Sequence, residues 1–279
     1  MAITTRDQLI DALGNNTSRI IINKTSSNSN TAGAFRSYWR EPGQPAAGAI
    51  PTAVATCNNA TLGGVNFTQQ TSPATSYLGL FECASTVGGQ TVEIHDRLAH
   101  MGGLSGTVTT AQTVGLDLAA LLATDNIAAR IGDSNYSDVL WWLEWYTATG
   151  TTAVTATVNV TFNDGTSNNL SAVSLAASRP AGLMVNLNTF VQAADAGKFI
   201  RDVNSVTLSA TTGTAGNFGV TATRYRAASF APLANARYTQ DWAQLGLPSI
   251  PNAACLFPIL LPSATGSTGL LGTGKIVHG

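Results

Sequence analysis

The chain has 279 residues and a formal net charge of −1, and 44% of its residues are hydrophobic. This composition excludes general disorder and a dominant nucleic-acid-binding surface. Only 10% of the residues are charged, against roughly 25% in a typical soluble domain. The first ten residues, MAITTRDQLI, contain charges and lack the apolar stretch of a signal peptide.

The N-terminal region, residues 1–34, is predicted to contain a helix, a strand and a loop. Thr5 and Gln8 have the spacing of a capping box, and apolar residues follow at helical intervals, so we expect a helix over residues 5–13. The β-branched run at 19–23 predicts a strand. The polar residues 24–34 predict a loop.

The next segment, residues 35–90, is expected to be irregular but ordered. Aromatic residues and arginines alternate at its start, and prolines and glycines then interrupt any long element up to about residue 75. We therefore predict few regular elements in this segment.

Residues 91–240 carry the strongest β-strand patterns. Strands are predicted where hydrophobic and polar residues alternate or where apolar runs are bounded by turns, and residues 163–166 contain an Asp-Gly hairpin turn. A short helix is expected near 116–122. The predicted strands are 91–98, 139–146, 154–162, 170–175, 206–211 and 218–223.

These patterns indicate a mainly β chain. Short strands separated by turns, without alternating long helices, favour an antiparallel β-sandwich of the jelly-roll kind with a short N-terminal helix and extended arms. We expect one domain over residues 1–279, with 91–240 as its sandwich core. Residues 241–279 form a C-terminal segment whose Gly-rich part, from residue 262, is interpreted as a tail that is flexible or ordered against a neighbour.

The chain has few residues suited to redox or metal chemistry. The three cysteines (Cys57, Cys83 and Cys255) are widely spaced, so reduced, buried thiols are expected. Glu93, His95, Asp96 and His100 form the only dense group of possible metal ligands. Hydrogen-bonded histidines near Asp96 and Arg97 are favoured over a zinc or iron site. We therefore expect no metal, no cofactor and no enzymatic activity; a metal-dependent hydrolase using Glu93, His95 and His100 is the enzyme alternative.

Aromatic residues at two places invite a binding interpretation. Trp141, Trp142, Trp145 and Tyr146 alternate across both faces of a predicted strand, which favours packing over a sugar-stacking platform. Arg, Tyr and Trp anchor many protein–protein contacts. We expect protein contacts at the N-terminal helix, the 35–40 stretch and the C-terminal segment. The predicted interface residues are Leu9, Ile10, Leu13, Phe35, Arg36, Tyr38, Trp39, Arg40, Trp242 and Leu245.

Four segments, TTRDQLIDAL, EIHDRLAHMGGL, WWLEWYTATG and DWAQLGLPSIPNAACL, resemble tailed-bacteriophage and prophage proteins encoded among virion-structure genes. The resemblance covers nearly the whole chain but contains no active-site motif. It implies a virion structural protein, and the β-sandwich expectation is similar to capsid decoration (cement) proteins.

This resemblance implies partners and a location. The expected partners are further copies of the chain, as a homotrimer, and the major capsid protein, with no direct nucleic-acid contact and no membrane. The expected location is the capsid of a virion assembled from protein made in the bacterial host cytoplasm. The alternative is a tail-associated glycan- or receptor-binding module.

Overall fold

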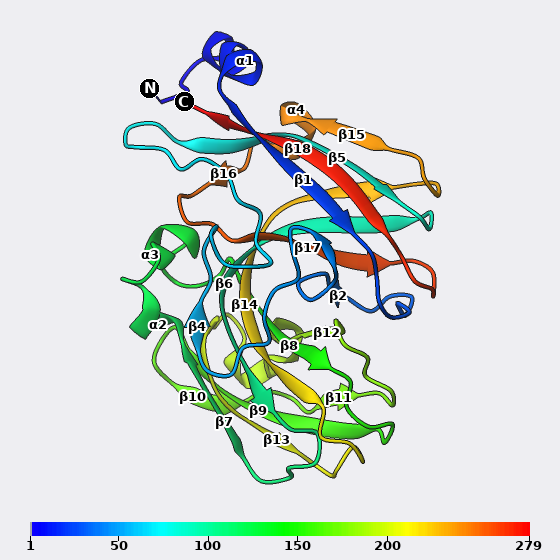
Figure 1. Ribbon diagram of the computed structural model, residues 1–279. Coiled ribbons are helices and arrows are strands. Elements are labelled where there is room, and N and C mark those ends of the chain that lie inside the picture. Colours follow the sequence, from blue (N-terminus) through cyan, green and yellow to red (C-terminus); the bar gives the residue numbers. More distant parts are fainter. Residues whose placement is uncertain (1) are drawn as a thin grey trace. The chain divides into compact units, whose positions relative to one another are not determined.

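The computed structural model describes residues 2–279, and these form a mainly β chain (Figure 1). They divide into two compact units, here called unit 1 and unit 2. Unit 1 consists of Met1–Ala49, Asn58–Asp96 and Tyr225–Gly279, and unit 2 of Ile50–Cys57 and Arg97–Arg224. Two long strands, β6 (Gln90–Leu104) and β14 (Asn217–Ala231), contribute residues to both units. The single domain expected over residues 1–279 stays a prediction.

Unit 1 contains a six-stranded antiparallel sheet with the order β15-β5-β18-β1-β3, in which β16 also pairs with β5. The helix α1 (Arg6–Asn15) leads directly into β1. The strands are β1 (Thr17–Lys24), β3 (Gly43–Gln44), β5 (Ser76–Ser85), β15 (Tyr238–Asp241), β16 (Ser249–Ile250) and β18 (Leu270–His278). A four-residue helix, α4 (Trp242–Leu245), lies between β15 and β16.

The core of unit 1 lies between this sheet and a second layer. That layer contains the first residues of β6, paired with β17 (Leu256–Pro262), which also pairs with β2 (Arg36–Ser37). Alternation along β1 turns Ile20 and Ile22 inward, where they join Phe81 of β5 and Ile94 of β6 in one buried cluster. Unit 1 therefore has two β layers around one apolar core.

Unit 2 has its own two layers. One sheet has the order β10-β9-β13-β7, with β11 also pairing with β9, and the other layer contains β12, β8, β14 and β6, with β4 beside β6. The strands are β4 (Ala55–Thr56), β7 (Gln112–Asp117), β8 (Val139–Thr147), β9 (Val154–Phe162), β10 (Ser167–Asn169), β11 (Val173–Leu175), β12 (Met184–Asn186) and β13 (Ile200–Leu208). Its helices are α2 (Leu118–Leu121), α3 (Ile127–Arg130), η1 (Leu187–Phe190) and η2 (Ala193–Asp195).

Side chains from both layers of unit 2 fill one core. Trp141 and Phe218 enter it from β8 and β14, and Val158 and Val203 enter it from β9 and β13. The strict alternation of β9, in which every second residue from Val154 is buried, produces this arrangement. Unit 2 is a β-sandwich.

The predicted fold class is confirmed: the chain is mainly β, its sheets are antiparallel, and a short helix precedes them. The capping box is present, because Thr5 accepts a hydrogen bond from the N–H of Gln8 while the Gln8 side chain accepts from the N–H of Thr5. The predicted short helix near residue 118 is α2.

Three details of the sequence interpretation are wrong. The segment predicted as irregular contains the ten-residue strand β5, and the predicted tail contains β18, which lies between β1 and β5. The return strand predicted at 170–175 is interrupted, so that β10 and β11 pair separately with β9. The glycines of β18 suggested a tail, but they are required by close packing: a Cβ on Gly274 would lie 2.7 Å from the carbonyl oxygen of Leu80.

Candidate interaction surface

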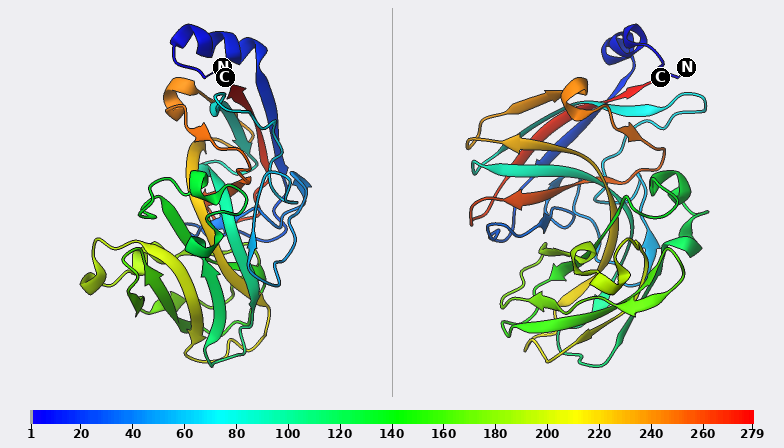
Figure 2. Two further views of the ribbon diagram at one scale, coloured as in Figure 1. Left: turned by 90° about the vertical axis from the view of Figure 1, so that its left-hand side faces the viewer. Right: turned by 180° about the vertical axis from the view of Figure 1, so that it is seen from behind.

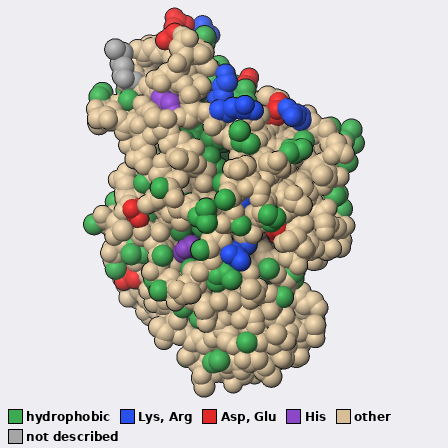
Figure 3. All heavy atoms as spheres, viewed as in Figure 1, with side chains coloured by type: hydrophobic (Ala, Val, Ile, Leu, Met, Phe, Trp, Pro, Cys, Tyr) green, Lys and Arg blue, Asp and Glu red, His purple; other side chains and the backbone are tan. Residues whose placement is uncertain are grey.

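Many of the few charged side chains lie in the interior. Charged groups are almost never fully buried unless they are paired. Their burial leaves a surface that is poor in charge, and the face drawn in Figure 3 shows few red or blue side chains outside the region of the six-stranded sheet and α1. Among the described residues the buried charged side chains are Lys24, Arg36, Glu41, Asp96, Arg97, Arg130, Glu144, Arg179, Asp195, Asp202 and Arg226.

In unit 2 the buried charges form a hydrogen-bonded network around Arg97. Its guanidinium donates to Glu144 Oε2 at 2.7 Å, to the Tyr146 hydroxyl at 2.9 Å and to His100 Nδ1 at 2.9 Å. Burial, reinforced by the charge of Glu144, raises the pKa of Tyr146 well above its usual value. Arg97 also donates to the Thr221 hydroxyl of β14 at 3.0 Å, so the network joins β6, β8 and β14 and supports the fold.

The predicted metal-ligand residues are engaged in hydrogen bonds. In unit 1, His95 Nε2 lies 2.8 Å from Glu93 Oε2, and Asp96 pairs with Arg226 at 2.8 Å. Residues 2–279 contain no group of three histidine, cysteine or acidic side chains that could hold a metal ion. The three cysteines are buried thiols, as predicted.

The aromatic residues of β8 are packed in the interior, which confirms the packing interpretation. Trp141, Trp142, Trp145 and Tyr146 are each at most 1% exposed. The indole N–H groups of the three tryptophans have internal partners. That of Trp141, for example, donates to the carbonyl oxygen of Ile200 at 2.8 Å. These four rings therefore form no surface platform for a sugar.

The predicted contact stretch at residues 35–40 lies mostly inside unit 1. Tyr38 and Trp39 are 0% and 1% exposed, and Arg36 forms a buried ion pair with Glu41. The Tyr38 hydroxyl donates to a backbone carbonyl at 2.7 Å, and burial raises the pKa of Tyr38 to about 12. Phe35 and Arg40 are partly exposed. The interface role of this stretch stays a prediction.

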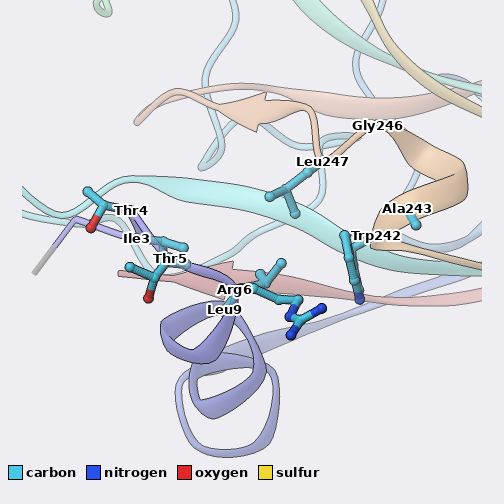
Figure 4. Close-up of a pocket in the computed structure, with 9 residues that line it drawn as sticks. All are labelled: Ile3, Thr4, Thr5, Arg6, Leu9, Trp242, Ala243, Gly246 and Leu247. Carbon is cyan, nitrogen blue, oxygen red and sulfur yellow. The ribbon is translucent and has the colours of Figure 1, made fainter.

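By contrast, the structure brings the other two predicted contact regions together. Leu9 of α1 packs against Val277 of β18, and Trp242 and Leu247 pack onto the same small cluster. An open groove of about 460 Å³ lies between α1 and α4 (Figure 4). Its lining is mainly apolar and consists of Ile3, Thr4, Thr5, Arg6, Leu9, Trp242, Ala243, Gly246 and Leu247.

Local sequence signals position both walls of the groove. On one side, the amide of Asn16, just after α1, donates to the carbonyl oxygen of His278 at 2.9 Å. On the other side, Asp241 caps α4 by accepting from Ala243 and Gln244, and Gly246 ends α4 in the left-handed conformation with φ of 71°. The strands before and after α4 both pair with β5. The groove is therefore built on regular elements.

The predicted interface residues divide by position. Leu9 and Trp242 line the groove, Leu13 packs onto its apolar cluster, and Leu245 packs against the core of unit 1. Ile10 lies on the outer side of α1 and is 56% exposed. The sequence interpretation missed Ile3 and Leu247; an apolar residue directly after the helix-ending Gly246 was the available signal for Leu247.

No protein-family model matches the chain, and no curated protein matches its sequence. Similar solved structures include that of the infectious bursal disease virus Gx strain, with 7% identity over 95% of this chain and 83% of that chain and a TM-score of 0.20. Another is the infectious bursal disease virus VP2 subviral particle, with 9% identity, 94% and 81% coverage and a TM-score of 0.15. These similar structures are of virus particles, and TM-scores this low carry no argument about function. Within residues 2–279 no helix is both long and apolar enough to cross a membrane.

Proposed function

We propose that this chain is a non-enzymatic virion structural protein of a tailed bacteriophage, which oligomerises and stabilises the capsid lattice as a decoration or minor capsid protein. The observation that carries the proposal is the scarcity of surface charge: only 29 of the 279 residues are charged, and eleven of these are buried. Surface charge keeps a free-standing protein dispersed. A surface that is poor in charge is typical of a chain whose surface is covered by neighbouring subunits.

In this function, the groove between α1 and α4 is the region that contacts the capsid shell. Its apolar side chains Trp242 and Leu247 stand on anchored elements and are partly exposed, and the buried Leu9 lies beneath them. Burying apolar area there stabilises a contact by roughly 25 cal/mol for each Å² removed from water. The sequence resemblance to virion-gene products supports a major capsid protein as the partner and a trimer of this chain as the unit that binds it.

The tail-associated glycan-binding alternative has less support. It called for an exposed platform of tryptophan and tyrosine rings, and the rings of β8 that suggested it are buried. The enzyme alternative called for a metal bound by Glu93, His95 and His100, but His95 pairs with Glu93 and His100 accepts a hydrogen bond from Arg97.

The proposal is tested by Leu247→Asp, which places a charge in the groove. We expect this variant to fold and to lose at least tenfold in affinity for capsids of the phage that encodes the chain, because the carboxylate must be desolvated in the contact. Co-sedimentation of purified chain with those capsids measures the affinity. The matched control is Leu233→Asp, which makes the same change at a residue that is 68% exposed outside the groove. Absence of binding by the unmodified chain would reject the function.

A further inference from the structure

The outer face of the six-stranded sheet carries an unusual charge pairing. Arg19 of β1 lies directly opposite Lys275 of β18, and both side chains are exposed. Like charges directly opposite each other across two strands repel and destabilise a sheet. Within residues 2–279 neither side chain has an acidic partner: Arg19 donates to the Thr273 hydroxyl and Lys275 donates to the Leu13 carbonyl oxygen.

Apolar side chains lie beside these two cations. Ile21 and Leu271 belong to the same pair of strands, point outward and are each 48% exposed. With Arg19, Thr273 and the Glu82–Arg237 ion pair they border a shallow hollow of about 180 Å³. Figure 3 shows several blue side chains over this sheet, with red ones beside them. An apolar centre beside charged groups is the composition of a protein-binding face.

The outer side of α1 has the complementary composition. Asp7, Ile10 and Asp11 are exposed and follow the i, i+3, i+4 spacing that places residues on one side of a helix. Asp7 and Asp11 repel each other at this spacing, and neither forms an ion pair within the described residues. The sheet therefore presents a pair of cations and α1 a pair of carboxylates, and each pair lies next to exposed aliphatic side chains.

Within one chain these two surfaces do not meet. Leu9 and Ala12, on the opposite side of α1, pack against Val277, so the Asp7–Ile10–Asp11 stripe faces away from the strand that anchors the helix. Figure 2 shows α1 at the end of β1 and β18, beyond the middle of the sheet. The complementary surface must come from another molecule.

We propose that the outer face of the six-stranded sheet binds α1 of a second copy of this chain, with Asp7 and Asp11 against Arg19 and Lys275 and Ile10 against Ile21 and Leu271. The spacing fits this pairing. Side chains at i and i+4 of a helix are about 5–6 Å apart at Cβ, and directly opposed strand residues are about 4.5–5.5 Å apart. The inference rests on the proposed self-assembly and specifies its contact.

The test uses single charge reversals in the full chain. Lys275→Glu places an acid opposite the acidic helix, and Asp11→Lys places a cation opposite the basic sheet. We expect each variant alone to self-associate at least tenfold more weakly than the parent in sedimentation velocity. We expect an equimolar mixture of the two to recover association, because the cation introduced into α1 of one copy then meets the carboxylate introduced into β18 of the other.

Asp133→Lys is the matched control, since it reverses an exposed acid of unit 2 and should leave association unchanged. Recovery in the mixture also shows that both variants are folded. If the parent associates and either reversal leaves its affinity unchanged, or the mixture fails to recover, the contact is wrong and the proposed function stands. A parent that remains monomeric yet binds capsids overturns the contact and the proposed self-assembly, and leaves only the capsid binding of the proposed function. A monomeric parent that ignores capsids overturns both.

Discussion

Two arginine sites of this chain illustrate opposite uses of charge. Arg97 in unit 2 is fully buried and hydrogen-bonded to Glu144, Tyr146 and His100. The carboxylate of Glu144 therefore compensates its buried positive charge. Arg19 in unit 1 is exposed and lies opposite another cation. The first site supports the fold at the expense of surface charge. At the second site, Arg19 and Lys275 repel each other and no acidic side chain of the described residues compensates them. Such an arrangement is typical of a surface that binds a partner.

The largest expected effect concerns the buried site. Arg97→Met should lower the free energy of unfolding by about 3–5 kcal/mol, because it leaves the carboxylate of Glu144 buried without its cation. Urea denaturation measures the loss. The matched control is Arg224→Met, which removes a partly exposed pair with Asp138 and should cost about 0–1 kcal/mol. Equal losses in the two variants would remove the distinction between buried and surface charge.

A second prediction concerns the carboxyl groups of Asp117 and Asp202, which lie opposite each other on β7 and β13. Burial raises the pKa of Asp202 to about 6, although a hydrogen bond from Arg201 opposes the shift. Burial also acts to raise the pKa of Asp117, but hydrogen bonds from Ala120 and Asp202 outweigh it and lower that pKa. The proximity of the two carboxyl groups adds to the rise of the Asp202 pKa and to the decrease of the Asp117 pKa.

The sign of the effect on stability follows from these directions. The folded chain holds the proton on Asp202 more tightly than the unfolded chain does. Its contribution to stability is therefore complete below about pH 4 and is lost as the pH rises through about 6, a change on the order of 2 kcal/mol. Asp117 has the opposite sign: its contribution is present above its ordinary pKa and is lost as the pH falls.

Denaturation at several pH values tests this prediction. The decrease in unfolding free energy between pH 4 and 6 should be smaller in Asp202→Asn than in the parent, because the amide cannot titrate. Asp133→Asn changes an exposed acid and should retain the parental slope. Identical slopes in the parent and Asp202→Asn would mean that burial does not raise the pKa of Asp202.

The smallest expected effect concerns the exposed site. Lys275→Gln removes the charge opposite Arg19 and should raise the unfolding free energy of the dilute, monomeric chain by a few tenths of a kcal/mol. The same change should weaken self-association. Lys198→Gln is the control, because Lys198 pairs with Asp164 and Asp195 and its loss should not stabilise the chain. A loss of stability in Lys275→Gln would contradict the view that this charge serves a partner.

The sequence predicted those parts of the fold in which local pattern and final environment agree. Thr5 and Gln8 indicated the start of α1, and the alternation of Val154–Phe162 indicated β9. It failed for β18, because the glycines that suggest a tail are there to let β5 approach closely. Pairing between segments nearly 200 residues apart, such as β5 with β18, leaves no local signal.

The candidate site shows the same division. Leu9 and Trp242 could be selected as contact residues from composition, and both line the groove. That they face each other depends on β18 and β5, which join the two ends of the chain in one sheet. Tyr38 and Trp39 have the composition of contact residues as well, yet the chain itself covers them. Composition identifies apolar and aromatic residues that must be shielded from water. Only the tertiary structure shows whether the chain itself or a partner buries them.

The most direct measurement of the central claim is a count of this chain in purified particles. Phage particles from a bacterial culture that carries the gene are purified by density gradient and analysed by quantitative mass spectrometry and cryo-electron microscopy. The account predicts many copies per particle, arranged as oligomers on the capsid lattice. Particles that form normally and contain none of the chain would contradict it.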